Sequence, residues 1–371
     1  MRKLSAVAIG GSNTVMRPGY LTELPRCLER HGISLDLKAN LAVGNTTILN
    51  GLINLKSKED VLKVSDVLLI EYTLNDTSAF AGSLESVSKW VKGMEGAIRF
   101  ARTVNPSIKV IPIIFATRTG VHRSTINPLH GGVHYLANYY GLVAVDVNAA
   151  MMVRFGRDFF EAPGAYGDYA HYQRPVFTTL AAEIIADKVK DSLLSRTTPP
   201  ALPPPVDPEN YGDAGLIASS SVDGLKEDRF KNYLYDETTF DLGSGSLEIE
   251  IEGGTLLAAK FACTDDISQC YAKVNNCWYQ ARTLQPGMEE PKYKFLLSMI
   301  SFDGLPQPKP GTRILLTGAK PNVEDIRELP QHGARKPVRD EVRLPICAIL
   351  HTGKLKGLRT VVAQEDEILR A

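Results

Sequence analysis

The sequence predicts an α/β protein with a doubly wound parallel sheet in three layers, followed by a smaller β-sandwich-like domain. In the first half of the chain, short apolar runs rich in β-branched residues alternate with longer segments of helical character. That alternation is typical of a parallel sheet with crossover helices. A proline-rich stretch then interrupts the chain, and the short alternating runs beyond it are typical of antiparallel strands.

The first domain is predicted to span residues 1–196. Its expected strands are residues 4–9, 33–38, 67–72, 108–115 and 142–147. Its expected helices lie at about 19–30, 84–104, 128–140 and 174–195. Functional loops of a doubly wound sheet gather beyond the carboxyl ends of its strands, so the residues that follow these strands are candidates for a site.

The proline-rich stretch predicts the domain boundary. Proline lacks an amide hydrogen and restricts the residue before it, so residues 197–210 cannot continue the preceding helix and are expected to form an extended linker. Residues 211–371 are then predicted to form a β-rich accessory domain, and binding of a carbohydrate or of a partner is the role we consider for it. Its expected strands include residues 247–251, 256–261, 294–300 and 313–316.

Composition and the N-terminal residues indicate the class of protein and its compartment. Lys+Arg and Asp+Glu balance at 42 each, so the formal charge of zero gives no reason to expect nucleic acid. The odd number of cysteines, without any CxxC pair, favours free thiols in a reducing compartment. Residues 1–9 carry a short apolar run that reads as a strand rather than a signal peptide. We expect a cytoplasmic protein without a membrane span.

Four short islands follow or face the predicted strand ends, at residues 10–13, 44, 73–76 and 168–171. Acyl transfer needs a hydroxyl nucleophile, a base and donors for the negative charge on the carbonyl oxygen. Ser12 supplies the hydroxyl, His171 can take its proton, and Asp168 can orient the imidazole. The oxyanion donors are the Ser12 and Gly44 N–H groups and the Asn75 side-chain amide. Removing one such donor typically raises the activation barrier by about 3–4 kcal/mol.

These islands, in this order, resemble the SGNH hydrolases, also called GDSL-type lipases and esterases. The resemblance covers roughly residues 1–195 and implies a flavodoxin-like fold with Ser12, Gly44, Asn75 and His171 as the four named residues. Residues 40–46 are similar to the family's second block. Two positions depart from the pattern: the usual Gly-Asp-Ser is Gly-Gly-Ser here, and the usual Gly-x-Asn-Asp begins with Thr73. The missing aspartate changes how the nucleophile loop is braced.

The predicted function is a serine esterase that hydrolyses a short acyl ester, with O-acetyl on a carbohydrate or glycoconjugate as the expected substrate. The mechanism requires neither a metal nor an organic cofactor. Two alternatives use the same chain: an O-acyltransferase in which a sugar hydroxyl replaces water, and a non-catalytic glycan-binding protein. The sequence sets no oligomeric state.

Several further residues have more than one interpretation. Asp76 is either a second functional acid or a helix cap, and capping is favoured. His130 and His134 have a spacing that suits zinc on a helix, but no acidic partner lies between them. Arg118, His122 and Arg123 are either pocket residues or solvated loop charges. In the second domain, four aromatic side chains form either a sugar-stacking platform or part of the core, and the core is the favoured interpretation. They are Tyr271, Trp278, Tyr279 and Tyr293.

Overall fold

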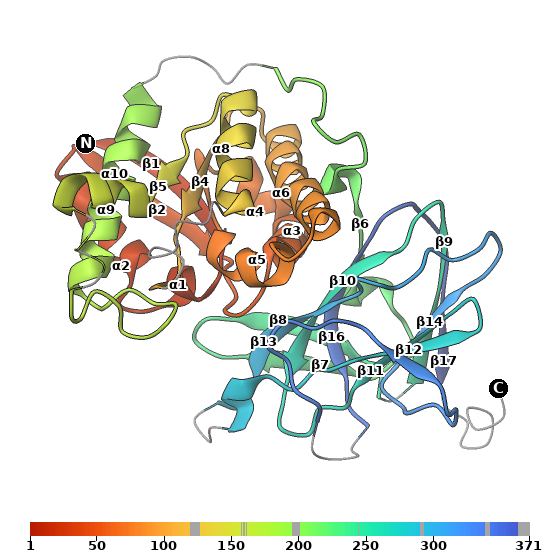
Figure 1. Ribbon diagram of the computed structural model, residues 1–371. Helices are drawn as coiled ribbons and strands as arrows, with labels where there is room; N and C mark the ends of the chain where they lie inside the picture. Colours follow the sequence, from red (N-terminus) through yellow and green to blue (C-terminus); the bar gives the residue numbers. More distant parts are fainter. Residues whose placement is uncertain are drawn as a thin grey trace. The chain divides into compact units, whose positions relative to one another are not determined.

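The computed structural model describes residues 1–118, 127–156, 158, 160, 162–194, 201–243, 245–289, 293–337 and 342–362. The chain forms two compact units, Met1–Gly212 and Asp213–Ala371 (Figure 1).

The first unit is built on a parallel sheet of order β2-β1-β3-β4-β5. Its strands are β1 (Arg2–Gly10), β2 (Ile33–Asn40), β3 (Val67–Glu71), β4 (Lys109–Ile114) and β5 (Val145–Asp146). Every residue of β3 is buried. A strand that is covered on both faces is expected to be largely apolar, which explains why β3 was predictable as an apolar run.

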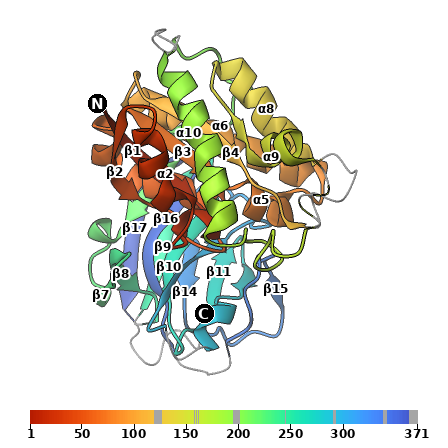
Figure 2. The ribbon, with the colours of Figure 1, turned by 90° about the vertical axis from the view of Figure 1, so that its left-hand side faces the viewer.

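Helices cover both faces of this sheet (Figures 1 and 2). On one face, α2 (Tyr20–Glu29), α9 (Val147–Phe155) and α10 (Val176–Leu194) share a core with alternate residues of β1. The other face carries α3 (Ile48–Ser57), α6 (Leu84–Val104) and α8 (Pro128–Tyr140). The short helices are α1 (Ser12–Val15), α4 (Glu59–Lys63) and α5 (Thr73–Phe80). The predicted three-layer α/β class is confirmed.

Local signals fix the helix ends. The Ser83 hydroxyl accepts a hydrogen bond from the Ser86 N–H at 3.1 Å and caps α6. The Asn127 side chain caps α8, which has proline at its first position and ends at Gly141 with a φ of 62°. A left-handed residue after the last turn is the common end of a helix and favours glycine.

Residues 201–212, called here the proline segment, lie along α6 and α8 within the first unit. Arg99 donates to the Pro203 carbonyl at 2.8 Å, and Tyr139 donates to the Pro204 carbonyl at 2.9 Å. Gly96 lets the segment approach closely, because a Cβ there would lie 2.7 Å from the carbonyl carbon of Tyr211. Residues 197–200 of the predicted linker lie outside the described residues.

A buried glutamate holds the centre of the proline segment. Glu95 of α6 is fully buried, and its carboxylate accepts from the Val206 N–H at 2.6 Å and from the Asp207 N–H at 2.9 Å. The Tyr140 hydroxyl of α8 donates to the same carboxylate. The prolines on either side prevent regular secondary structure here, so the backbone N–H groups of this segment need other partners. The Glu95 carboxylate supplies them.

The second unit contains two sheets. One has the order β13-β10-β16-β8-β7, with β6 paired to β16, and the other has the order β15-β12-β11-β14-β9-β17. Pairing is antiparallel except between β12 and β15. Inward side chains of both sheets, among them Phe261, Ile349, Ile249 and Leu316, form one core. The predicted β-rich second domain is confirmed.

The strands of this unit are β6 (Gly215–Ala218), β7 (Glu227–Lys231), β8 (Asp236–Asp241), β9 (Gly245–Glu252), β10 (Leu256–Cys263), β11 (Cys270–Val274), β12 (Cys277–Ala281), β13 (Leu296–Ser301), β14 (Ile314–Thr317), β15 (Ile326–Glu328), β16 (Pro345–His351) and β17 (Lys354–Val362). A two-residue turn joins β11 to β12, and its residues Asn275 and Asn276 have φ values of 49° and 66°. Two successive left-handed residues match the twist of a tight hairpin. Among the described residues, no helix has both the length and the apolar character of a membrane span.

Candidate active site

Ser12 begins α1 at the carboxyl end of β1. The Gly11 N–H donates to the Glu71 carbonyl at 3.0 Å, which ties the turn before Ser12 to β3. A Cβ on Gly11 would lie 2.5 Å from the Asn75 amide nitrogen, so a side chain here would displace the Asn75 side chain.

The structure brings Ser12, His171 and Asp168 together in one line of hydrogen bonds. The Ser12 Oγ lies 2.7 Å from His171 Nε2. His171 Nδ1 lies 2.7 Å from Asp168 Oδ2 and 2.9 Å from Oδ1. An ionised Asp168 accepts only, so Nδ1 carries the proton and Nε2 is left to accept from the Ser12 hydroxyl. In this tautomer His171 can receive the serine proton.

Asp168 is held in its ionised form. Partial burial raises its pKa, but hydrogen bonds from His171 and from the backbone N–H groups of Ala170 and His171 outweigh that effect and lower the pKa. The two backbone bonds are 2.8 and 2.9 Å long. The Asp168 side chain is 58% exposed, and that of His171 is 27% exposed. Water therefore has access to this part of the site.

The loop that carries Asp168 and His171 is fixed at its base and at its tip. Tyr166 and Tyr172 form a bridge, and the Gly167 N–H donates to the His171 carbonyl at 2.8 Å. The Tyr166 hydroxyl donates to the Ala116 carbonyl, just beyond β4, at 2.9 Å. These bonds hold the loop over the carboxyl edge of the sheet.

Asn13, which the sequence analysis did not select, links this loop to the turn that carries Ser12. Its side-chain amide donates to the Ala170 carbonyl at 3.3 Å, and the residue is 3% exposed. Arg118 makes a second link at the tip of the loop, where its backbone N–H donates to the Tyr169 carbonyl at 3.0 Å. His122 and Arg123 lie outside the described residues. Adjacency to Ser12 is the sequence signal that points to Asn13.

Gly44 lies beside Ser12, and Asn75 lies beside Gly11. The Val43 N–H donates to the Gly10 carbonyl at 3.0 Å, and a Cβ built on Gly44 would lie 3.7 Å from the Ser12 Cβ. Asn75, in the first turn of α5, is 7% exposed, and its amide donates to the Thr46 carbonyl at 2.9 Å. That bond uses one of the two hydrogens on the amide nitrogen. The predicted oxyanion donors therefore lie at one edge of the sheet.

Asp76 has a structural environment. It is fully buried and accepts from the Ile48 N–H at 3.0 Å and from the Trp90 indole at 2.8 Å. Burial raises its pKa to about 8, and these two bonds oppose the rise. Asp76 thus binds the first turn of α3 and the side of α6 to α5, the helix that carries Asn75.

The described residues do not join the candidate histidines or the aromatic residues of the second unit into a site. His134 lies 3.4 Å from Asp146, and the described residues contain no group of three or more His, Cys, Asp or Glu able to hold a metal. Tyr271, Trp278 and Tyr279 are buried, as the core interpretation predicts, whereas Tyr293 is 41% exposed.

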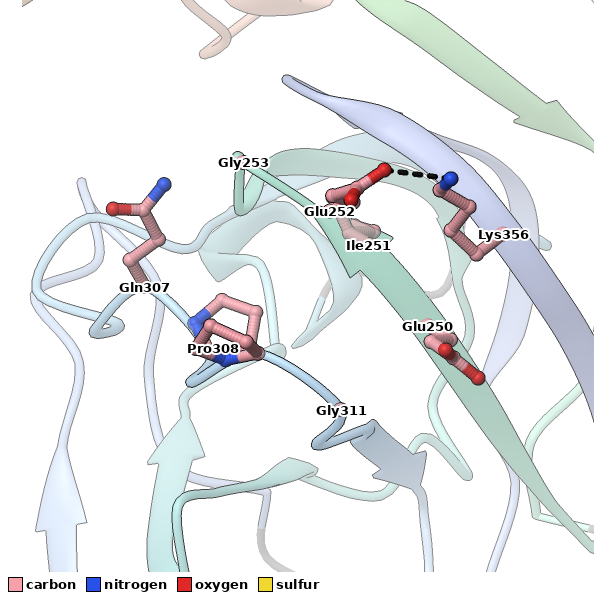
Figure 3. Close-up of a pocket in the computed structure, with 9 residues that line it drawn as sticks. Glu250, Ile251, Glu252, Gly253, Gln307, Pro308, Gly311 and Lys356 are labelled. Atoms are coloured by element: carbon pink, nitrogen blue, oxygen red, sulfur yellow. Dashed lines mark ion pairs between the residues drawn. The ribbon is translucent and has the colours of Figure 1, made fainter.

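A pocket in the second unit is lined by the end of β9 and by residues 307–311 (Figure 3). Glu252 and Lys356 approach each other across its rim, 2.6 Å apart. Glu250 lies 3.4 Å from Arg313. Because both carboxylates already have cationic partners, the pocket does not present an uncompensated charge to a ligand.

Comparison with known proteins identifies the fold. No protein-family model and no curated protein matches the sequence. Two solved structures of a two-domain esterase active on acetylated mannans, one of them co-crystallised with mannopentaose, match 95% of this chain and 92% of theirs. Their TM-scores are 0.60 and 0.61, at 14% and 15% identity. The chain has the fold of a two-domain esterase. The similarity extends across both units of that fold, so the order of the domains is shared as well.

Proposed function

We propose that the protein is a serine esterase of the SGNH type that removes short acyl groups, O-acetyl above all, from a carbohydrate. The observation that carries the proposal is the line of hydrogen bonds from Ser12 Oγ through His171 to Asp168, with 2.7 Å at each step. Gly44, next to the Ser12 side chain, and the Asn75 amide, next to Gly11, support it. These are the groups that acyl transfer requires.

The chemistry follows from the positions of these groups. Ser12 Oγ attacks the ester carbonyl carbon while its proton moves to His171 Nε2. The carbonyl oxygen becomes an oxyanion that accepts from the Ser12 and Gly44 N–H groups and from the Asn75 amide. The bond to the alcohol oxygen then breaks, and His171 returns the proton to that oxygen. Water, deprotonated by His171, attacks the acyl-enzyme and releases the acid and free Ser12.

The substrate class rests on a different argument. The two solved structures with this two-domain fold act on acetylated mannans, and both units of the chain are matched by them. An acetylated polysaccharide is therefore the substrate to test first. The wide exposure of Asp168 favours water over a sugar hydroxyl as the acyl acceptor, because a transferase must keep water out.

The test is to treat the protein and Ser12→Ala with a fluorophosphonate probe, and to measure acetate release from acetylated and deacetylated mannan oligosaccharides. We expect labelling and acetate release that depend on Ser12. Aryl esters of two, four and eight carbons report the acyl length, and added sugar acceptors report transfer. A protein that is neither labelled nor active, yet binds the oligosaccharide, would instead be a glycan-binding protein.

A further inference from the structure

Glu71 is the last residue of β3, and it contacts the nucleophile turn at two points. Its backbone carbonyl accepts from the Gly11 N–H at 3.0 Å. Its carboxyl oxygen Oε2 accepts from the Thr14 hydroxyl at 2.9 Å. The parallel register of β1 and β3 sets Gly10 opposite Glu71, so the turn that follows β1 lies within reach of this side chain. One residue therefore holds both ends of the segment that contains Ser12.

Thr14 transmits the contact to α1. The residue is 1% exposed, and its hydroxyl lies 3.1 Å from the Tyr20 hydroxyl. Because a hydroxyl has one hydrogen and Thr14 donates it to Glu71, Tyr20 is the donor in the second bond. The Thr14 carbonyl accepts from the Asn40 amide at 3.0 Å. Thr14 is thus tied to β3, to α2 and to the end of β2.

Helix α1 depends on these contacts for its orientation. It has only four residues, and its N-cap residue, Gly11, has no side chain that could cap the helix. A single turn pays the full cost of helix nucleation with few hydrogen bonds in return, so it is not stable by itself. Tertiary bonds must therefore determine where α1 places the Ser12 side chain.

We propose that Glu71 is a positioning residue for the nucleophile: through Thr14, its carboxyl group fixes α1 so that Ser12 Oγ stays in line with His171 Nε2. The inference rests on the proposed function and names a residue that acts without touching the substrate. Keeping an acid at 1% exposure is costly, and burial raises the pKa of Glu71 to about 8. An apolar residue would fill this space at lower cost, so the hydrogen bond to Thr14 is what the acid provides.

The experiment uses two matched pairs in the full chain. Thr14→Val and Glu71→Leu remove the donor and the acceptor at similar volume, whereas Thr14→Ser and Glu71→Gln keep them. For each variant we would measure kcat and KM for a short-chain aryl ester and the second-order rate of fluorophosphonate labelling. Thr283→Val is the control, because it removes a buried hydroxyl that donates to the Ser268 carbonyl in the second unit. Near-ultraviolet circular dichroism checks the fold.

A misplacement of about 1 Å at a reacting group typically costs on the order of 100-fold in rate. We therefore expect Thr14→Val and Glu71→Leu to lower kcat and the labelling rate by about 10- to 100-fold with little change in KM. Thr14→Ser, Glu71→Gln and Thr283→Val should stay within about threefold of the wild type. Tyr20→Phe, which keeps the ring, should give an intermediate loss and serves where Thr14→Val fails to fold.

Three results would overturn the inference. A folded Thr14→Val protein with wild-type kcat and labelling would show that the contact does not position Ser12. Equal losses in Thr14→Val and Thr14→Ser, or a rise in KM alone, would assign the effect to packing or to substrate binding. A wild-type protein that is not labelled at Ser12 would overturn the proposed function itself, and the inference with it.

Discussion

The side-chain amide of Asn75 occupies the space that a side chain at residue 11 would need. A Cβ on Gly11 would lie 2.5 Å from the amide nitrogen and 2.9 Å from the amide carbon. Gly11 and Asn75 are therefore one spatial unit, although 63 positions separate them along the chain. A side chain at residue 11 is therefore expected to displace the Asn75 amide.

The first prediction tests that relationship. Gly11→Ala should push the Asn75 amide away from the proposed oxyanion position and lower kcat by about 100-fold, since one lost donor has an effect of this order. Gly11→Asp should lower it at least as much. Steady-state kinetics with a short-chain aryl ester gives the measurement. Gly131→Ala in α8, where a Cβ meets nothing within 4 Å, is the matched control and should be unchanged. Full activity of folded Gly11→Ala would refute the steric argument.

The second prediction concerns Asp168. In Asp168→Asn the new amide can donate to Nδ1 of His171 and so favours the tautomer that carries its proton on Nε2, where it cannot accept from Ser12. We expect kcat to fall by about 10³- to 10⁴-fold. The control is Asp187→Asn, which alters another acid–histidine pair, 3.1 Å from His31 on a different face of the unit. A loss below about tenfold would mean that His171 keeps its tautomer without Asp168.

How far the sequence predicts this fold depends on burial. Strands β3 and β4 were predictable because both faces of the sheet are covered there and their apolar runs are continuous, whereas the edge strand β2 alternates apolar and polar residues. Helix α3 was not, since every residue from Ile48 to Leu55 is buried and no polar face marks a helical period. Helix α5 begins inside the site, with β-branched and polar residues that have weak helix propensity.

The candidate site divides in the same way. The sequence analysis selected five residues because their side-chain types suit acyl transfer and because they follow strands or lie in a loop near the strand ends. They are Ser12, Gly44, Asn75, Asp168 and His171. Glu71 and Thr14 were not selected, because their contact depends on the register between β1 and β3, which a single sequence does not reveal. Asp76 has the appearance of a local cap in the sequence, yet it binds Ile48 and Trp90 on two other helices.

The third prediction is a pH dependence of stability. Burial, with a contribution from the charge of Asp76, raises the pKa of Glu71 from 4.5 to about 8, although hydrogen bonds from Thr14 and Gly11 oppose the rise. Between these two pH values the native state holds a proton that the unfolded state has released. The free energy of unfolding should therefore fall as pH rises through this window, by at most about 1.4 kcal/mol per pH unit, and level off above pH 8.

Urea unfolding of the wild type and Glu71→Gln from pH 5 to pH 9 measures this effect as a difference, so other titrating groups cancel. The variant has no proton to lose, and its stability relative to the wild type should rise with pH across the window. Glu59→Gln, at an exposed position paired with Lys63, is the control and should show no such trend. A difference that is constant with pH would mean that Glu71 ionises with an ordinary pKa.

The fourth prediction concerns the proline segment. Glu95→Ala removes the acceptor of the Val206 and Asp207 N–H groups and of the Tyr140 hydroxyl. Buried donors that lose their acceptor destabilise the folded state, so we expect the free energy of unfolding to fall by about 2–5 kcal/mol. We also expect faster proteolysis between residues 201 and 212. Glu209→Ala breaks only the surface ion pair with Lys92 and should change neither quantity measurably. If the two variants were cleaved at the same rate, Glu95 would not be what binds this segment to α6.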